Sequence, residues 1–305
     1  MRIQNQLKTF ATAILLLVTS IPAFAWNYTG HRVIASIAYR QFDDQTKQRI
    51  GEILKRHPAC ADLWENRPTN RPDEILNLLW NASVFPDDAR SEPWRRYGRS
   101  PAHYVNYRIL TDQGVRIEPP LRGENILNSY VARLKRLQNP RISIEDKALH
   151  LSWMLHQAGD IHQPLHAVAR FSKALPNGDR GGNEVHVPNP RGRSNNLHAY
   201  WDDLLGTDKE PAAIEKLADD LMRENPISVF ADELKKTNIN DWAEESVQIC
   251  LKTVYRNLDP EITTFADLPL GYEADAKRVA RRRAALSGYR LADELRRLLG
   301  DLEKP

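Results

Sequence analysis

Apolar residues recur every three or four positions along most of this chain, which is the spacing of amphipathic helices. Seven segments show the pattern: residues 31–55, 72–80, 124–138, 144–161, 211–223, 240–256 and 273–299. Strand signals are few, and the best is Glu184–Val187, which follows two glycines and predicts one arm of a hairpin. The pattern therefore predicts a mainly α fold with a small β-hairpin.

Two stretches interrupt the helical pattern. Residues 172–196 are rich in Pro, Gly, Asn, Ser and Arg, and residues 96–123 are also irregular. Loops of this length inside a compact domain are usually functional or disordered. Because no internal repeat and no linker is evident, we predict that residues 26–302 form a single multi-helix domain with long loops. The arginines of Lys277–Arg297 are interleaved with leucines, which is typical of a solvated helix with a core-facing stripe rather than a nucleic-acid patch.

The N-terminus has the features of a secretory signal peptide. A cationic start precedes the apolar run Ala13–Val18, and Ala23–Ala25 supplies an A-x-A cleavage signature. The run is too short to cross about 30 Å of hydrocarbon. We therefore expect residues 1–25 to be removed between Ala25 and Trp26, and the mature chain to be exported to the periplasm or the extracellular space. No later segment is apolar enough to cross a membrane, so we expect no stable membrane association, and no obligate protein partner is evident.

Charge is nearly balanced, since the 305 residues include 43 Lys and Arg against 40 Asp and Glu, a formal charge of +3. This balance excludes a strongly basic histone-like binder and an acidic disordered tail. Residues 1–25 contain two cations and no anions, so the charge of the mature chain falls to +1. The two cysteines, Cys60 and Cys250, allow one disulfide at most, and the sequence leaves open whether they pair or remain two buried thiols.

Histidine and aspartate residues are concentrated between residues 156 and 166. His156 and Asp160 are four residues apart, so a helix would place them on one face. Pro164 cannot comfortably continue that helix, and the resulting turn is expected to bring His166 back beside them.

A second pair with the same spacing follows at His198 and Asp202. Neutral imidazole and carboxylate are ligands that suit zinc. A single histidine is more often a satisfied core or surface residue, but two such pairs with an extra histidine favour a metal site. The expected mature terminus adds a free amine at Trp26, five residues before His31, and this amine with the adjacent carbonyl oxygen can chelate a metal. The indole of Trp26 is a donor only, so we expect it to pack and fix the terminus.

Together these motifs resemble a known family, the single-strand-specific zinc nucleases of the S1/P1 type, which belong with the zinc-dependent phospholipases C. The resemblance rests on Trp26, His31, D-x-x-R at Asp87–Arg90, H-Y-x-N at His103–Asn106, H-x-x-x-D-x-H-Q-P-L-H at His156–His166, G-G-N at Gly181–Asn183 and N-L-H-x-x-W-D at Asn196–Asp202. These motifs occur in the family's order and span about two thirds of the mature chain.

The resemblance implies a site for three zinc ions. It assigns the first zinc to Asp87, His103, His156 and Asp160, the second to His166, His198 and Asp202, and the third to the Trp26 amine and carbonyl, His31 and Asp160 as a bridge. Asp87 rather than Asp88 fits the D-x-x-R register, although Phe85-Pro86 stands where the family has Trp-Ala. Asp88 is then expected beside the ligands or at the surface.

The resemblance also implies four residues that contact substrate. Arg90 would clamp phosphate, and its alternative is an ion pair with Asp87 or Asp88. Tyr104 would stack on a nucleobase. Asn106 stands where fungal members carry Asp, and Asp203 stands where they carry Asn, so base preference is expected to differ.

Four histidines match no ligand position. His162 is expected to pack or to support the ligands from outside, and His57, His150 and His186 are expected to be structural.

The function implied by the family is hydrolysis of single-stranded DNA and RNA to 5′-phosphate products, together with release of phosphate from 3′-nucleotides. A zinc-bound hydroxide would attack phosphorus, with Asp160 and Arg90 as catalytic residues. The alternative is a zinc-dependent phospholipase C, but those enzymes tend to carry Glu at the position of Asp202 and Asn at that of Ala169. A metal- or phosphate-binding protein without activity is a third interpretation, which the complete ligand set disfavours.

Overall fold

The computed structural model describes residues 26–60, 73–192 and 194–301. Its helices are α1 (Tyr28–Tyr39), α2 (Asp44–Leu54), α3 (Glu74–Asp88), α4 (Ile126–Leu137), α5 (Ile144–Asp160), α6 (Leu197–Asp202), α7 (Pro211–Glu224), α8 (Ile239–Ile249) and α9 (Tyr272–Asp301). Its strands are β1 (Tyr107–Leu110), β2 (Arg116–Glu118) and β3 (Val168–Phe171). The prediction of a mainly α fold with a small hairpin is confirmed.

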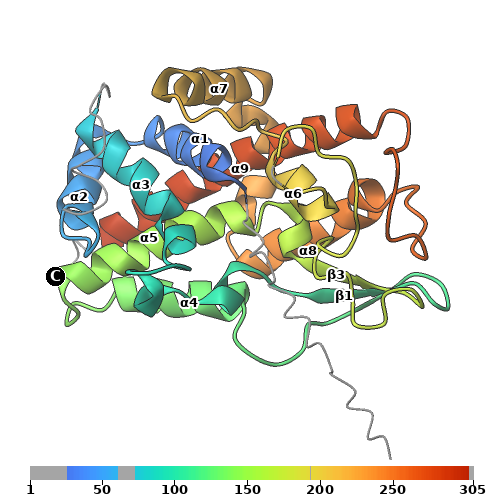
Figure 1. Ribbon diagram of the computed structural model, residues 1–305. Coiled ribbons are helices and arrows are strands. Elements are labelled where there is room, and N and C mark those ends of the chain that lie inside the picture. The colour runs from blue at the N-terminus through green and yellow to red at the C-terminus, as the bar shows by residue number, and fades with distance from the viewer. Residues whose placement is uncertain (1–25, 61–72, 193, 302–305) are drawn as a thin grey trace, which may run out of the picture.

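The helices pack in layers around α1 and α5. α5 packs against α3 and α4, and α1 packs against α3, α7 and α9. The small sheet lies at one side of the helical body, at the lower right of Figure 1. The core between the helices is apolar, and it includes the fully buried rings of Trp80, Trp153 and Trp242.

Helix ends follow local capping chemistry. The continuous apolar pattern over residues 31–55 divides into α1 and α2, because Asp43 caps α2 by accepting a hydrogen bond from the Thr46 N–H at 2.8 Å. α3 extends past residue 80 to Asp88 and includes Pro86. The last turn of the predicted segment 240–256 is a π-helix at Cys250–Val254, which continues α8.

The prediction of a strand at Glu184–Val187 is wrong. Its segment makes one isolated bridge, from His186 to Thr264, because its backbone bonds to single residues of two loops rather than to a neighbouring strand. The hairpin is formed instead by β1 and β2, which pair antiparallel within the stretch predicted to be irregular, and β3 pairs parallel with β1.

Two further sequence questions are answered by the fold. Cys60 and Cys250 are both buried and are not joined by a disulfide, so they are two thiols in the core. Within the part of the chain that the structure describes, no helix combines the length and the apolar character needed to cross a membrane.

Candidate metal centre

Side chains from six elements meet at one buried centre. α1, α3, α5 and α6 contribute, together with two short 3-10 helices, η3 (Ser100–His103) and η4 (Pro164–His166). The residues that meet there are His31, Asp87, His103, His156, Asp160, His166, His198 and Asp202, and each is less than 5% exposed. The structure thus brings together every histidine and aspartate ligand predicted from the sequence.

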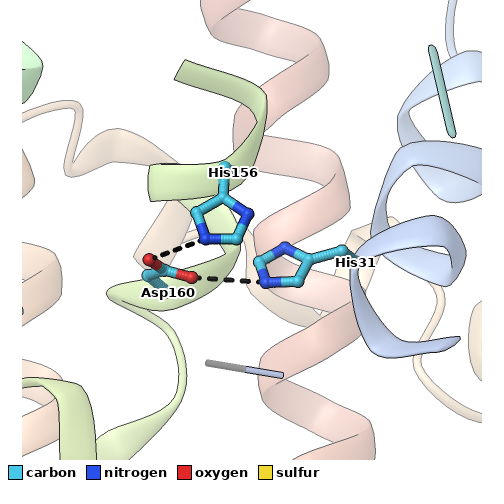
Figure 2. Close-up of side chains that lie close together, drawn as sticks. All are labelled: His31, His156 and Asp160. Carbon is cyan, nitrogen blue, oxygen red and sulfur yellow. Dashed lines mark ion pairs between the residues drawn. The ribbon is translucent and has the colours of Figure 1, made fainter. Parts of the chain in front are cut away.

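Asp160 directs one carboxylate oxygen towards His31 and the other towards His156 (Figure 2). Its Oδ1 is 3.3 Å from Nε2 of His31, and its Oδ2 is 3.2 Å from Nε2 of His156 and 3.1 Å from Nδ1 of His103. The rings of His31 and His156 stack with their centroids 4.0 Å apart. One carboxylate therefore faces two groups of nitrogen atoms, as a residue that bridges two metal ions must.

Asp87, and not Asp88, faces the same histidines. Its Oδ1 is 3.7 Å from Nε2 of His156 and 3.9 Å from Nδ1 of His103. Asp88 instead accepts a hydrogen bond from the hydroxyl of Tyr28. Asp87 is therefore the aspartate that is placed to ligate a metal with His103 and His156.

Arg90 forms an ion pair with Asp87, with its NH2 2.9 Å from Oδ1. This pair is one of the alternatives that the sequence left open. The Arg90 side chain is 13% exposed, so the guanidinium lies at the edge of the centre, and its contact with a phosphate group stays a prediction.

His166, His198 and Asp202 form a second group. The Nε2 atoms of the two histidines are 3.1 Å apart, and Oδ2 of Asp202 is 3.7 Å from Nε2 of His198. The side chain of Gln163 donates a hydrogen bond to Oδ1 of Asp202 at 2.7 Å, which leaves Oδ2 directed at the histidines. Gln163 was not predicted to act in the site, although it belongs to the histidine-rich motif.

Backbone carbonyls fix which ring nitrogen of three histidines carries the proton. Nδ1 lies near such an oxygen in His156 (Ser83 O, 2.8 Å), His166 (His103 O, 2.7 Å) and His198 (Gly181 O, 2.6 Å). A carbonyl oxygen only accepts hydrogen bonds, so Nδ1 must donate and Nε2 of the neutral ring keeps its lone pair. The two Nε2 atoms that face each other at 3.1 Å are thus both acceptors, and a shared cation is what they fit.

Burial destabilises the ionised carboxylates of the centre unless a cation lies beside them. It raises the pKa of Asp160 to about 7 and that of Asp202 well above its usual range, because no water solvates the ionised carboxylates. The same loss of solvation lowers the pKa of His103 and His166 well below the usual value, so these rings are neutral. Neutral imidazoles beside carboxylates that need a positive neighbour are a donor set that suits a divalent metal ion.

Polar atoms without hydrogen bonds support the same fit. Both ring nitrogens of His31, Nε2 of His103 and Oδ1 of Asp160 are buried and form no hydrogen bond. The 3.3 Å approach between His31 and Asp160 is not aligned as one. A buried polar atom left unsatisfied costs about 1–3 kcal/mol, which coordination would remove.

The start of the described chain lies beside the second group. Trp26 is fully buried, and the next N–H, from Asn27, donates to the carbonyl of Asp202 at 3.4 Å. The Asn27 side chain caps α1 by accepting from Gly30 N–H at 3.1 Å. The peptide bond before Trp26 involves residue 25, which lies outside the described residues, so ligation by a free amine stays a prediction.

The candidate substrate residues face different surroundings. Tyr104 is 37% exposed and Asn106 is also exposed, and both follow the ligand candidate His103. Asp203 is buried, and its two oxygens accept hydrogen bonds from Asn27 at 2.8 Å and Asn189 at 3.0 Å. Asp203 therefore ties the N-terminal segment to a loop, whereas Tyr104 and Asn106 are open to a solute. Contact of these three residues with substrate stays a prediction.

The histidines without a predicted ligand position belong to none of the three groups of possible metal ligands, which are His31/His156/Asp160, Asp87/His103/His156 and His166/His198/Asp202. His162 is buried, its Nδ1 donates to the carbonyl of Ala158 at 2.7 Å, and its Nε2 accepts from Arg290 at 2.9 Å. His57 packs edge-on against Phe85. The arginine that holds His162 comes from α9, far away in the sequence, and no sequence signal pointed to it.

Comparison with known proteins agrees with this site. The S1/P1 Nuclease family matches residues 26–300, a range that includes every candidate metal ligand. The chain is 27% identical to Endonuclease 4 of Arabidopsis thaliana over 97% of this chain and 96% of that protein. It is 26% identical to Endonuclease 3 of the same plant (98% and 97% covered) and 25% identical to Endonuclease 2 (94% and 95%). Since the match covers nearly all of the described chain, this protein belongs to the S1/P1 nuclease family.

Proposed function

We propose that this protein is a zinc-dependent endonuclease that hydrolyses single-stranded DNA and RNA to 5′-phosphate products and releases phosphate from 3′-nucleotides. The observation that carries the proposal is the pair of Nε2 lone pairs of His166 and His198, which face each other beside Asp202. Membership of a nuclease family and the endonuclease names of its relatives support the reaction class.

Charge favours an anionic substrate. Three zinc ions would bring about +6 and the aspartates Asp87, Asp160 and Asp202 would return −3, which leaves a centre of about +3 in a nearly neutral protein. Bound zinc supplies the positive charge that lowers the pKa of water and that balances charge on phosphoryl oxygens. This explains why a nuclease needs no high net charge.

The side chains around the metal ions have separate roles in this proposal. Asp160 holds the two histidine sets on either side of one carboxylate, which fixes the spacing of the centre. We assign to Arg90 the role of clamping a phosphate group with its guanidinium, and its position beside Asp87 supports this assignment. Tyr104 offers an exposed ring on which a base can stack, and Asn106 offers an amide to the base edge.

Export belongs to the same proposal. We infer that residues 1–25 are a signal peptide and that cleavage before Trp26 releases an amine in the periplasm or outside the cell. The hydrogen bond between Asn27 and Asp202 supports this inference, because it holds the new terminus beside the metal centre.

The proposal is tested by metal content and by a substrate panel. The purified mature chain should contain about three zinc ions, and it should cleave a single-stranded oligonucleotide faster than the duplex of the same sequence. Phosphatidylcholine should be a poor substrate. A protein without zinc, or one that prefers phosphatidylcholine or cleaves duplex and single strands equally, would contradict the proposal.

Tyr104→Ala tests the stacking pocket. One base–aromatic stack contributes about 1–3 kcal/mol, so its loss is expected to lower kcat/KM for single strands roughly 5- to 150-fold. The kcat/KM for a small phosphodiester should change little. Tyr104→Phe keeps the ring and serves as the control. If the Ala and Phe variants cleave single strands equally well, Tyr104 does not bind a base.

A further inference from the structure

An arginine-rich segment connects two parts of the metal centre. Residues 90–104 contain four arginines and a single acidic residue, Glu92. Arg90 is paired with Asp87, whereas Arg95, Arg96 and Arg99 are exposed. No ion pair of the described residues involves these three arginines.

Arg96 lies over the ring of Tyr97, 4.8 Å from its centroid, and Arg99 donates a hydrogen bond to the carbonyl of Gly98 at 2.9 Å, contacts that do not neutralise a positive charge. The lack of a carboxylate partner distinguishes the three arginines from their neighbours in the hairpin. There, Arg108 pairs with Glu118, and Arg116 lies 3.7 Å from Asp112. Cations that have carboxylate partners offer little extra charge to a ligand. Arg95, Arg96 and Arg99, which we call the arginine segment, keep their charge available.

The chain between Arg96 and Arg99 is held against the end of α3. The ring of Tyr97 lies 6.2 Å from that of Phe85, two residues before Asp87. Gly98 lies so close to Ala89 that a Cβ at this position would overlap the Ala89 carbonyl oxygen. The segment therefore packs directly beside the turn that carries Asp87 and Arg90.

The end of the arginine segment leads into the base-binding candidate. Arg99 is the N-cap residue of η3, which ends at His103, and Tyr104 follows at once. The Tyr104 carbonyl accepts the N–H of Ile126 at 3.0 Å, which fixes this end to the start of α4. Contacts with Ala89 and Ile126 hold this stretch in place. Along the chain, the exposed cations lie between Arg90, which pairs with Asp87, and the ligand candidate His103.

We propose that Arg95, Arg96 and Arg99 bind backbone phosphates of a single strand whose reacting nucleotide lies at the metal centre. The proposal rests on the nuclease function proposed above and deepens it. Guanidinium groups match phosphate oxygens, and a basic track beside an aromatic ring is how proteins bind single strands without sequence preference. The arginine segment makes the enzyme select polymers over mononucleotides, because a mononucleotide has no further phosphate to reach it.

The test is the variant Arg95→Gln/Arg96→Gln/Arg99→Gln, measured in the zinc-loaded enzyme. Its kcat/KM for an oligonucleotide of about 12 nucleotides, divided by that for a 3′-mononucleotide, should fall about tenfold or more at low salt. The slope of log kcat/KM against log salt for the oligonucleotide should also become less negative by about 2, since each phosphate contact of a single strand contributes about −0.7.

The matched control is Lys135→Gln/Arg136→Gln/Arg141→Gln. These three cations are also exposed and lie at or beyond the far end of α4. The control should keep the ratio and the salt slope of the wild type.

Three outcomes are decisive. An unchanged ratio and slope in the arginine-segment variant, with an active wild type, would overturn this proposal while the nuclease function stands. Equal losses in the control would show a general charge effect and would also overturn it. A wild type that cleaves neither substrate would instead refute the proposed function.

Discussion

Replacing Glu245 by Gln is predicted to destabilise this protein by about 3 kcal/mol at pH 7. Glu245 accepts hydrogen bonds from Arg290 at 2.7 and 2.8 Å and from Arg283 at 2.7 Å. Both arginines are less than 5% exposed, and both also hold His162, through its ring and its carbonyl oxygen. His162 follows Asp160 by two residues, so this network fixes the turn that carries a central ligand.

The magnitude follows from two arguments. Burial raises the pKa of the Glu245 carboxyl, but hydrogen bonds from Arg290 and the charges of Arg283 and Arg290 outweigh it and hold the pKa at about 2. The lowering corresponds to about 3.4 kcal/mol, or about 2–3 kcal/mol after allowance for the solvent that reaches this carboxylate. Removing one partner of a buried ion pair typically destabilises a protein by about 3–5 kcal/mol. The two ranges meet near 3 kcal/mol.

The pH dependence has a definite sign. A carboxyl whose folded pKa is lowered contributes its full stability above its unfolded pKa of 4.5, and the contribution is lost as the pH falls towards 2. The difference in stability between wild type and Glu245→Gln should therefore be largest at pH 7 and shrink by about half at pH 3.

Urea unfolding at several pH values measures this difference. Glu244→Gln is the control, because Glu244 is the exposed neighbour and loss of metal in acid affects both variants alike. If Glu244→Gln and Glu245→Gln are equally stable at pH 7, or if their difference does not shrink in acid, the reasoning is refuted.

Two further substitutions and one N-terminal extension address the metal centre and its surroundings. Gly159→Ala should weaken zinc binding, measured by chelator competition, since its Cβ would lie 2.7 Å from Nδ1 of His31, whereas Gly300→Ala meets nothing within 4 Å and should bind zinc normally. Asp203→Ala should destabilise the protein by about 2 kcal/mol in urea, because the side-chain amides of Asn27 and Asn189 each lose one of two acceptors, and Asp203→Asn should lose less. An extra Met before Trp26 should lower zinc content and turnover, and its removal should restore both; equal values in the two forms would show that the terminal amine is not a ligand.

The parts of the fold that the sequence predicts are those set by local spacing. The helix over residues 144–161 is observed at Ile144–Asp160, with Ser143 as its cap, because its periodicity and its capping residue are both local. The same holds for the pairs His156–Asp160 and His198–Asp202. Their four-residue spacing predicts that the two side chains of each pair lie close together on one helix face, and they do.

The parts that the sequence misses depend on distant partners. Glu184–Val187 has the residue types of a strand, but its neighbours in space are single residues of loops. β1 and β2 are only four and three residues long, too short for a clear alternation. The family resemblance predicts Asp203 as a substrate contact because it stands where fungal members carry Asn, and only the structure shows that Asn27 and Asn189 donate hydrogen bonds to its oxygens.

The backbone carbonyls of the centre link its metal groups to one another. His103 offers its ring to the group of Asp87, and its carbonyl oxygen orients His166 in the second group. Ser83, one turn before Asp87, orients His156 in the same way. Because His156 and His166 are each held by the backbone of a segment that carries another ligand, displacement of one group must disturb the next. Metal loading of the three groups is therefore expected to be coupled, a property that no list of ligand residues in the sequence contains.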